Sequence, residues 1–142
     1  MQILISHRGN TKGPDEALEN NPEHIKRLLS SNPSLHVEID VWFKDGLLLL
    51  GHDSPQYIIN HDFLLRDRLW CHAKNLQALE YMLQYNITNC FWHQEDDFTL
   101  TTSGFIWTYP NKSVTKKSII VDTSKDWKNN KYNCYGVCVD YL

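Results

Sequence analysis

Short runs of apolar and β-branched residues recur along the whole chain, separated by polar segments that are rich in turn-forming residues. Runs of this length and composition are typical of β-strands. Eight of them predict a strand: 2–6 (QILIS), 36–42 (HVEIDVW), 47–52 (LLLLGH), 68–74 (RLWCHAK), 89–94 (NCFWHQ), 104–110 (GFIWTYP), 118–123 (SIIVDT) and 135–141 (YGVCVDY).

Helical periodicity is present in two of the intervening segments. Apolar residues within 15–30 and within 75–86 recur at intervals of three and four residues, so each segment predicts a helix with one apolar face. Residues 61–68 predict a third, shorter helix.

Strands that alternate with helices are typical of α/β folds, and eight strands is the number found in a (β/α)₈ barrel. The chain has 142 residues, whereas such barrels need roughly 200 or more. We therefore expect a single domain over residues 1–142, a compact (β/α)₈ TIM-like barrel with several outer helices shortened or missing. The second and third strands are too close in sequence for a helix between them, so they are joined by a hairpin or by an extended crossover.

Missing helices would leave some strands uncovered on their outer face. Val37, Ile39, Ile119 and Val121 are the residues that the alternation places there. Because apolar patches of this kind are commonly covered by a partner, we expect a homo-oligomer.

The run at 36–42 carries two acids among its apolar residues. Side chains alternate between the faces of a strand, so Glu38 and Asp40 share one face. A three-residue turn around the Asp-Gly pair that follows would bring His52 opposite Glu38. Two neighbouring carboxylates are costly to bury unless a positive charge lies between them. The pattern therefore indicates a metal ion beside a histidine.

Composition and charge argue against several classes of protein. A formal net charge of −3 offers no basic surface for nucleic acid. No apolar stretch approaches the roughly 18 residues of a membrane span, so we expect no stable membrane insertion. The first residues lack the features of a signal peptide. The four cysteines form no CxxC pair, which indicates free thiols, and we expect a cytoplasmic protein.

Five stretches taken together resemble one known family: SHRGN at 6–10, LENN at 18–21, VEIDVWFKDGLLLLGHD at 37–53, WCHAKN at 70–75 and YGVCVDYL at 135–142. In this order they resemble the glycerophosphodiester phosphodiesterases, which belong to the phospholipase C-like TIM-barrel phosphodiesterases. The ordered set over residues 6–53 is the most specific part, and the resemblance is thin between residues 75 and 133. It implies a TIM barrel that cleaves phosphodiesters with a divalent metal ion.

The resemblance implies roles for the ionisable residues. Glu38 and Asp40 match the acids that hold the cation, usually Mg²⁺ or Ca²⁺. His7 and His52 match the two catalytic histidines, one a general base and the other a general acid. His72 stands where the family has a third acidic ligand. We therefore expect Mg²⁺ or Ca²⁺, with Mn²⁺ or Zn²⁺ as the alternative because the imidazole of His72 suits Mn²⁺, Zn²⁺ or Fe²⁺ better than Mg²⁺.

Five further residues are candidates for binding the substrate. By the resemblance, Arg8 and Lys74 match the basic residues beside the phosphate, and Glu19 matches an acid that contacts the substrate. His93 can add a ligand to the metal site, can bind substrate, or can be hydrogen-bonded at the end of its strand. Trp107 can stack on the substrate or pack in the barrel interior.

These expectations combine into a metal-dependent phosphodiesterase that acts on a small phosphodiester, glycerophosphodiester-like or sugar-linked. With water as the nucleophile the enzyme would be a hydrolase, and with a substrate hydroxyl it would be a lyase that forms a cyclic phosphate. Two alternatives stay open. One is a catalytically inactive protein that binds a phosphate or sugar phosphate on the same fold. The other is a transition-metal hydrolase with His7, His52 and His72 as ligands.

Overall fold

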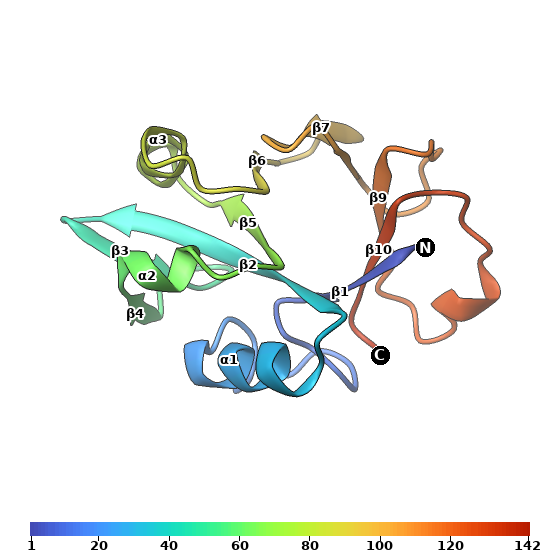
Figure 1. Ribbon diagram of the computed structural model, residues 1–142, viewed down its shortest axis with the longest axis horizontal. Helices are drawn as coiled ribbons and strands as arrows, with labels where there is room; N and C mark the ends of the chain where they lie inside the picture. The colour runs from blue at the N-terminus through green and yellow to red at the C-terminus, as the bar shows by residue number, and fades with distance from the viewer.

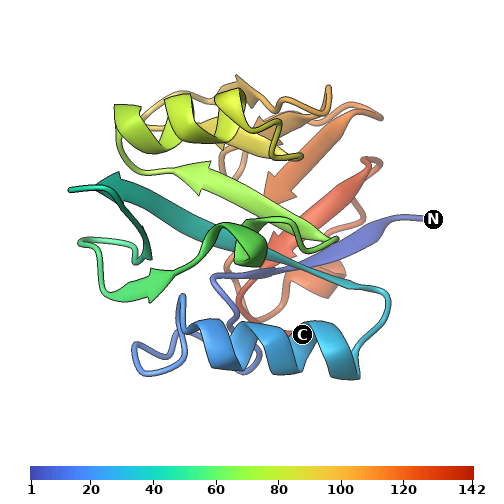
Figure 2. The same cartoon turned by 60° about the vertical axis from the view of Figure 1, so that its left-hand side comes forward.

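The computed structural model describes residues 1–142 as a mixed α/β structure, in which one curled sheet is flanked by three α-helices (Figure 1, Figure 2). The strands are β1 (Ile3–His7), β2 (Leu35–Lys44), β3 (Leu47–Leu50), β4 (Tyr57–Ile59), β5 (Leu69–Ala73), β6 (Cys90–Trp92), β7 (Phe98–Leu100), β8 (Ile106–Thr108), β9 (Ser118–Val121) and β10 (Gly136–Val139). The helices are α1 (Pro22–Ser31), α2 (His61–Leu64) and α3 (Leu76–Gln84), and a 3₁₀ turn η1 spans Trp127–Asn129. Each of the eight predicted runs contains a strand, while the hydrophobic pattern does not predict β4 and β7.

Seven strands run parallel, in the spatial order β6, β5, β2, β1, β10, β9 and β8. Three strands are antiparallel: β7 pairs with β8, and β3 and β4 continue outward from β2. The long strand β2 pairs with both β1 and β3, because β1 is registered with its first half and β3 with its second half. The carboxyl ends of the parallel strands therefore meet at one end of the curl.

The expectation of a (β/α)₈ barrel is wrong, because the sheet is an open half-barrel whose edges lie 25 Å apart. Isolated hydrogen bonds, such as Thr102 N–H to the Cys90 carbonyl at 2.9 Å, take the place of a strand ladder between β6 and β7. The connections after β6 form no α-helix, and the short antiparallel strand β7 occupies the position where another βα unit would continue the barrel.

The connection from β2 to β3 is a hairpin. Its turn is Asp45–Gly46, and both residues have a positive φ, 53° and 76°, as in the turns that match the twist of paired strands. Lys44 pairs with Leu47, so the turn has two residues and not three. The predicted pairing of Glu38 with His52 is therefore wrong, and His52 reaches the site from the loop after β3.

Helix α1 begins later than the predicted start at residue 15. The Asn21 side chain caps the helix by accepting hydrogen bonds from the N–H groups of Glu23 and His24, at 3.1 and 3.2 Å. Pro22 occupies the first turn, where its missing N–H group costs no hydrogen bond. Residues 15–20 form turns instead.

The other helices differ in how far they match the sequence pattern. Helix α3 confirms the prediction at 75–86, whereas α2 is only one turn of the longer helix predicted at 61–68. No helix combines the length and the apolar character that a membrane span requires.

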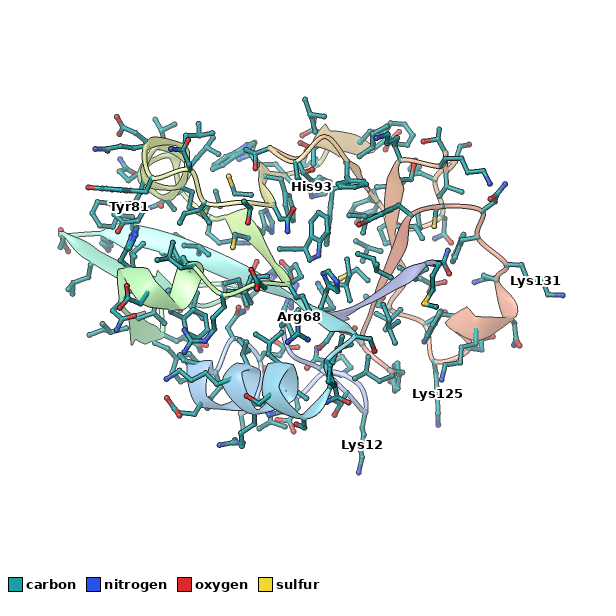
Figure 3. The ribbon with its side chains drawn as sticks, in the orientation of Figure 1. Lys12, Arg68, Tyr81, His93, Lys125 and Lys131 are labelled. Carbon is teal, nitrogen blue, oxygen red and sulfur yellow. The ribbon has the colours of Figure 1, made fainter.

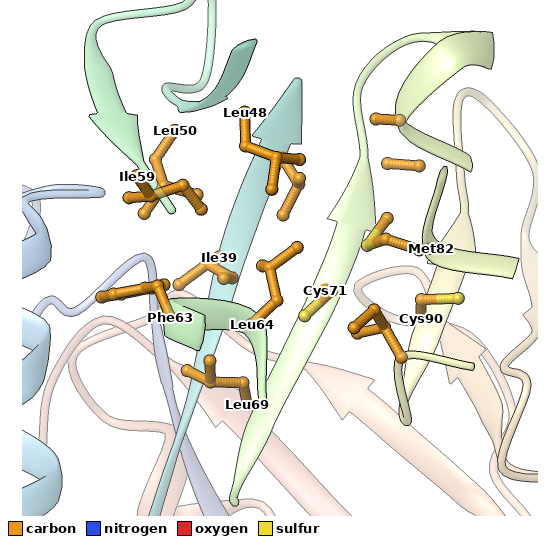
Figure 4. Close-up of a cluster of buried hydrophobic side chains, with 14 of the residues drawn as sticks. Ile39, Leu48, Leu50, Ile59, Phe63, Leu64, Leu69, Cys71, Met82 and Cys90 are labelled. Atoms are coloured by element: carbon orange, nitrogen blue, oxygen red, sulfur yellow. The ribbon is translucent and has the colours of Figure 1, made fainter. Parts of the chain in front are cut away.

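The main hydrophobic core lies between the outer face of β2 and β5 and the three helices (Figure 4). In this core Ile39 and Cys71 of the two strands pack with Phe63 of α2 and Met82 of α3. Val37 is also fully buried there. The outer face of β2, which the sequence analysis expects to be uncovered, is therefore covered by helices. All four cysteines are free, and three of them are buried.

A second apolar cluster fills the inside of the curl. Its buried members are Ile5, Trp70, Phe91, Trp107, Ile119 and Cys138. Ile119 lies in this cluster and Val121 lines a cavity above it, so neither residue belongs to the outer face where it was expected. These residues therefore no longer support the expected homo-oligomer, which stays a prediction.

Arg68, labelled in Figure 3, joins the start of β5 to the end of α1. Its guanidinium donates hydrogen bonds to the backbone carbonyls of Leu29, Asn32 and Leu35 at 2.7–2.8 Å. We expect Arg68→Ala to lower the free energy of unfolding by about 1.5–3 kcal/mol, the value of hydrogen bonds to a charged group. Urea unfolding would measure the change. The control is Arg27→Ala, which removes an exposed arginine of α1. Equal stability of the Arg68 and Arg27 variants would contradict the prediction.

Asp122 organises the long β9–β10 connection. Its carboxylate accepts hydrogen bonds from Ser124, from Asn130 at 2.9 Å and from the Tyr132 hydroxyl at 2.7 Å. Burial opposes the charged form, but these donors prevail and lower the pKa of Asp122 below its ordinary value of 3.8.

We therefore expect Asp122→Asn to reduce the free energy of unfolding by about 1–3 kcal/mol at neutral pH. A carboxyl with a lowered pKa stabilises the fold above its unfolded pKa, and this stabilisation is lost as the pH falls through the folded value. The difference between wild type and variant should therefore shrink as the pH falls below 3.8. Urea unfolding at a series of pH values measures it, with the exposed Asp126→Asn as control. A difference that is independent of pH would contradict the assignment.

Candidate functional site

A cavity of about 530 Å³ opens at the carboxyl ends of the parallel strands. This end of a parallel sheet is where α/β folds most often bind ligands. The lining residues are His7, Arg8, Glu38, Asp40, His52, His72, Ala73, Lys74, Trp92, His93, Gln94, Trp107, Tyr109, Pro110, Val121 and Thr123. The apolar cluster inside the curl forms the floor, so polar side chains occupy only the layer above it.

Glu38 and Asp40 project from β2 into this cavity. They are only 2% and 1% exposed. Burial and the neighbouring charge of Asp40 raise the pKa of Glu38. Burial also opposes the charge on Asp40, but His52, His72 and Arg8 hold its pKa well below the usual range. The two acids therefore have opposite tendencies, with Asp40 the more strongly ionised.

The two oxygens of Asp40 have different surroundings. Oδ2 accepts a hydrogen bond from Asn20 Nδ2 at 2.9 Å, and it lies 3.5 Å from His52 Nδ1 and 3.6 Å from Arg8 Nε. Asn20 also accepts a hydrogen bond from the Asp40 backbone N–H at 2.9 Å. Oδ1 instead faces His72 Nδ1 at 3.2 Å, with Lys74 Nζ at 3.9 Å. Oδ2 is thus hydrogen-bonded to Asn20, and Oδ1 is the oxygen available to a ligand.

His72 is oriented by groups on the neighbouring strand. Its Nε2 lies 2.8 Å from the backbone carbonyl of His93, and its ring stacks on Phe91 at 5.1 Å and 12°. A carbonyl oxygen can only accept a hydrogen bond, so Nε2 carries the proton. Nδ1 lies 3.2 Å from Asp40 Oδ1 and 3.9 Å from Glu38 Oε1. In the neutral ring Nδ1 would direct its lone pair at a cation held between these oxygens.

The donor atoms of Glu38, Asp40 and His72 lie within 4.8 Å of one another, so this group can hold a metal ion. Two carboxylate oxygens and an imidazole lone pair converge, and a cation would satisfy all three. The hydrogen bond from the other ring nitrogen to a carbonyl is the arrangement that usually orients a metal-binding histidine. His7 and His52 are not members of this group, which argues against the three-histidine donor set.

His7 is held at the end of β1 by a carboxylate. Its Nδ1 lies 2.9 Å from Asp140 Oδ1, and its Nε2 lies 4.0 Å from Glu38 Oε2. Burial lowers the pKa of His7, but the hydrogen bond to Asp140 and the charge of Glu38 outweigh it and raise the pKa overall. Asn10 donates to Asp140 Oδ1 at 2.8 Å. Asp140 therefore fixes the orientation of the ring, and Nε2 is the nitrogen that faces the cavity.

Arg8 links the acids to His52. Its backbone N–H donates to Glu38 Oε2 at 3.2 Å, and Nη2 lies 3.1 Å from His52 Nε2. Nη1 also lies 3.6 Å from Glu19 Oε2. The backbone φ of Arg8 is 58°, a strained value for a residue other than glycine. Arg8 Nε and His52 Nδ1 are buried without a hydrogen-bond partner, and both lie beside Asp40 Oδ2.

Nine of the ten predicted site residues line the cavity, and Glu19 is the exception. Glu19 instead accepts a hydrogen bond from Asn10 at 2.9 Å and lies beside Arg8, so it positions these residues. Trp107 is buried and stacks on Phe91 at 4.4 Å. His93 projects from the end of β6 (Figure 3), with Nε2 2.7 Å from the Asp96 carbonyl. Trp107 therefore packs in the floor, and His93 is hydrogen-bonded at its strand end.

The sequence pattern does not mark Asn10, Asn20 and Asp140 as site residues. Each is buried and bonded to a predicted residue or to its partner. Two of the three residues belong to the motifs that carry the family resemblance: Asn20 follows Glu19 in LENN, and Asp140 follows the apolar run VCV in YGVCVDYL. Their roles depend on hydrogen bonds between distant segments, which a sequence pattern does not specify.

Comparisons of this chain with models of protein families, with curated proteins and with solved structures returned no match. The resemblance to the glycerophosphodiester phosphodiesterases therefore rests on the motifs alone.

We expect Mn²⁺ to bind one site in isothermal titration calorimetry. His72→Ala should weaken this binding by about tenfold or more, since even residues that only orient metal ligands contribute 10–100-fold. His93→Ala is the matched control, because it removes a cavity imidazole but keeps the backbone carbonyl that orients His72. Equal affinities of His72→Ala and wild type would exclude His72 from the ligand set.

Proposed function

We propose that this protein is a metal-dependent phosphodiesterase that cleaves a small phosphodiester, glycerophosphodiester-like or sugar-linked, by acid–base catalysis with two histidines. One observation carries the proposal: a single cavity brings together a donor set for a cation, an arginine, and two histidines that lie outside that donor set. A site that only bound a cation would need neither the arginine nor the two additional histidines.

His7 is suited to hold or accept a proton. Asp140 fixes its Nδ1–H, so Nε2 is directed into the cavity as the reactive nitrogen. The same hydrogen bond stabilises the imidazolium after Nε2 has taken a proton from the nucleophile. His7 is therefore assigned as the general base and Asp140 as the residue that positions it.

Arg8 and His52 are suited to the phosphate and the leaving oxygen. The guanidinium of Arg8 has the fork geometry that binds phosphate oxygens, and it contacts His52 Nε2 at 3.1 Å. A guanidinium can only donate, so His52 Nε2 accepts in this contact and carries no proton. When Arg8 turns to a phosphate, Nε2 is free to take a proton from solvent, and it can then give that proton to the leaving alkoxide. Lys74, which lies 3.9 Å from Asp40, adds a second positive charge.

Glu38, Asp40 and His72 would hold the cation. A divalent ion there supplies positive charge to the non-bridging oxygens of the diester. One imidazole beside two carboxylates favours Mn²⁺ or Zn²⁺ over Mg²⁺ or Ca²⁺, which prefer oxygen ligands. The nucleophile is water in a hydrolase or a substrate hydroxyl in a lyase, and Nε2 of His7 serves as the base in both cases.

A second candidate is a phosphate-binding protein without turnover. The open half-barrel favours it, because a sheet with edges 25 Å apart encloses a substrate less completely than a closed barrel. The His7–Asp140 pair argues for catalysis, since binding of an anion does not require an oriented base.

Phosphorus NMR tests the proposal with a panel of glycerophosphodiesters and sugar phosphodiesters, in the presence of Mn²⁺, Zn²⁺ or Mg²⁺. We expect conversion that stops with chelator and that falls about 10²–10⁴-fold in His7→Ala and in His52→Ala, the usual contribution of an acid or base. The chemical shift of the product distinguishes a cyclic phosphate from a monoester.

His61→Gln is the control, because His61 lies on α2 and does not line the cavity. If no diester is converted while inorganic phosphate binds, the protein is the binding protein of the second candidate. Conversion that persists in both histidine variants would contradict the acid–base assignment.

A further inference from the structure

Charge is distributed unevenly over the walls of the cavity. The charged lining residues, Arg8, Glu38, Asp40 and Lys74, all come from the β1, β2 and β5 ends. The opposite wall comes from the ends of β6, β8 and β9 and contains no Asp, Glu, Lys or Arg. Its upper part consists of Trp92, His93, Gln94, Tyr109, Pro110 and Thr123. The cavity therefore has a charged end and a neutral end.

Aromatic rings connect the two ends. His72, in the metal-binding group, lies 6.1 Å from His93 in an edge-to-face arrangement at 65°. His93 in turn stacks on Tyr109 at 5.9 Å and 24°. Tyr109 is 48% exposed, at the rim. A ligand whose phosphate lies at the charged end would therefore extend its alcohol along His93 and Tyr109.

We propose that the neutral end recognises a neutral, hydroxyl-rich alcohol of the sugar or polyol class. This inference rests on the proposed function. Aromatic rings such as that of Tyr109 offer flat apolar surfaces to the C–H groups of a sugar ring. Gln94 and Thr123 supply donors and acceptors that match hydroxyl groups.

A quaternary ammonium alcohol fits this wall less well. Aromatic rings attract such cations, but a trimethylammonium group has no donor or acceptor for Gln94, Thr123 or the Tyr109 hydroxyl, so these groups add nothing to its binding. Acidic residues are present in the adjacent loop, but they do not line the cavity. Asp97 of that loop is paired with Lys112 at 3.2 Å. No carboxylate therefore belongs to the lining of the neutral end.

Isothermal titration calorimetry on the full chain with saturating Mn²⁺ tests this inference with three probes: glucose 1-phosphate, phosphocholine and inorganic phosphate. We expect glucose 1-phosphate to bind about tenfold more tightly than either of the other two. The double variant Tyr109→Ala/Gln94→Ala should lose this preference and keep its affinity for inorganic phosphate. Both residues are exposed, so the variant is expected to fold. Tyr85→Ala removes an equally exposed tyrosine that does not line the cavity, and it is the matched control.

The outcomes separate this inference from the proposed function. Tighter binding of phosphocholine, or equal binding of all three probes, would overturn the assignment of a neutral alcohol. A sugar preference that survives in the double variant would overturn the assignment of the wall. Sugar preference without turnover of any diester would support this inference and contradict catalysis. Absence of binding by every probe would overturn both.

Discussion

The burial of two carboxylates at alternate positions of one strand is the constraint on which the rest of the site depends. Glu38 and Asp40 are removed from water in the middle of β2, and an unpaired charge there would be prohibitively costly. Donors from separate parts of the chain offset this cost: Asn20 before α1, Arg8 after β1 and His52 after the β2–β3 hairpin. The oxygens that these donors leave free face His72. The site is thus shaped around an anionic pair with room for a cation.

The helices cover only part of the half-barrel, and the part that they cover is the one that carries the two acids. The helices pack on β2, β5 and β6, the strands that carry both acids and His72, so the residues that require the most accurate placement have the largest core behind them. On the other side of the sheet, Ile120 of β9 and Val137 of β10 pack instead against Trp127 of η1 and the loop that follows it (Figure 1). A closed barrel is unnecessary for this arrangement, because parallel pairing of β1, β2 and β5 alone brings their carboxyl ends together.

The site combines fixed groups with one group that can change partners. His7 is held by Asp140 and His72 by a carbonyl, so each ring has one defined reactive nitrogen. Arg8 instead contacts His52, and its Nε has no hydrogen-bond partner although it is buried. A phosphate would satisfy Arg8 and release His52 at the same time. In the proposed reaction, binding of the substrate would therefore also free Nε2 of His52 to take up the proton that it later gives to the leaving oxygen.

The sequence by itself determined eight of the ten strands, helix α3 and most of the cavity, because alternation and turn chemistry are local properties. Glu38 and Asp40 share a face whatever the fold, and His52 follows a short hairpin in any register. Only the tertiary structure decided that the sheet stays open, that Glu19 supports Arg8 instead of lining the cavity, and that Asn10, Asn20 and Asp140 hold the site together. These features depend on which distant segments meet and on which hydrogen bonds remain unsatisfied when they do, and residue spacing contains neither kind of information.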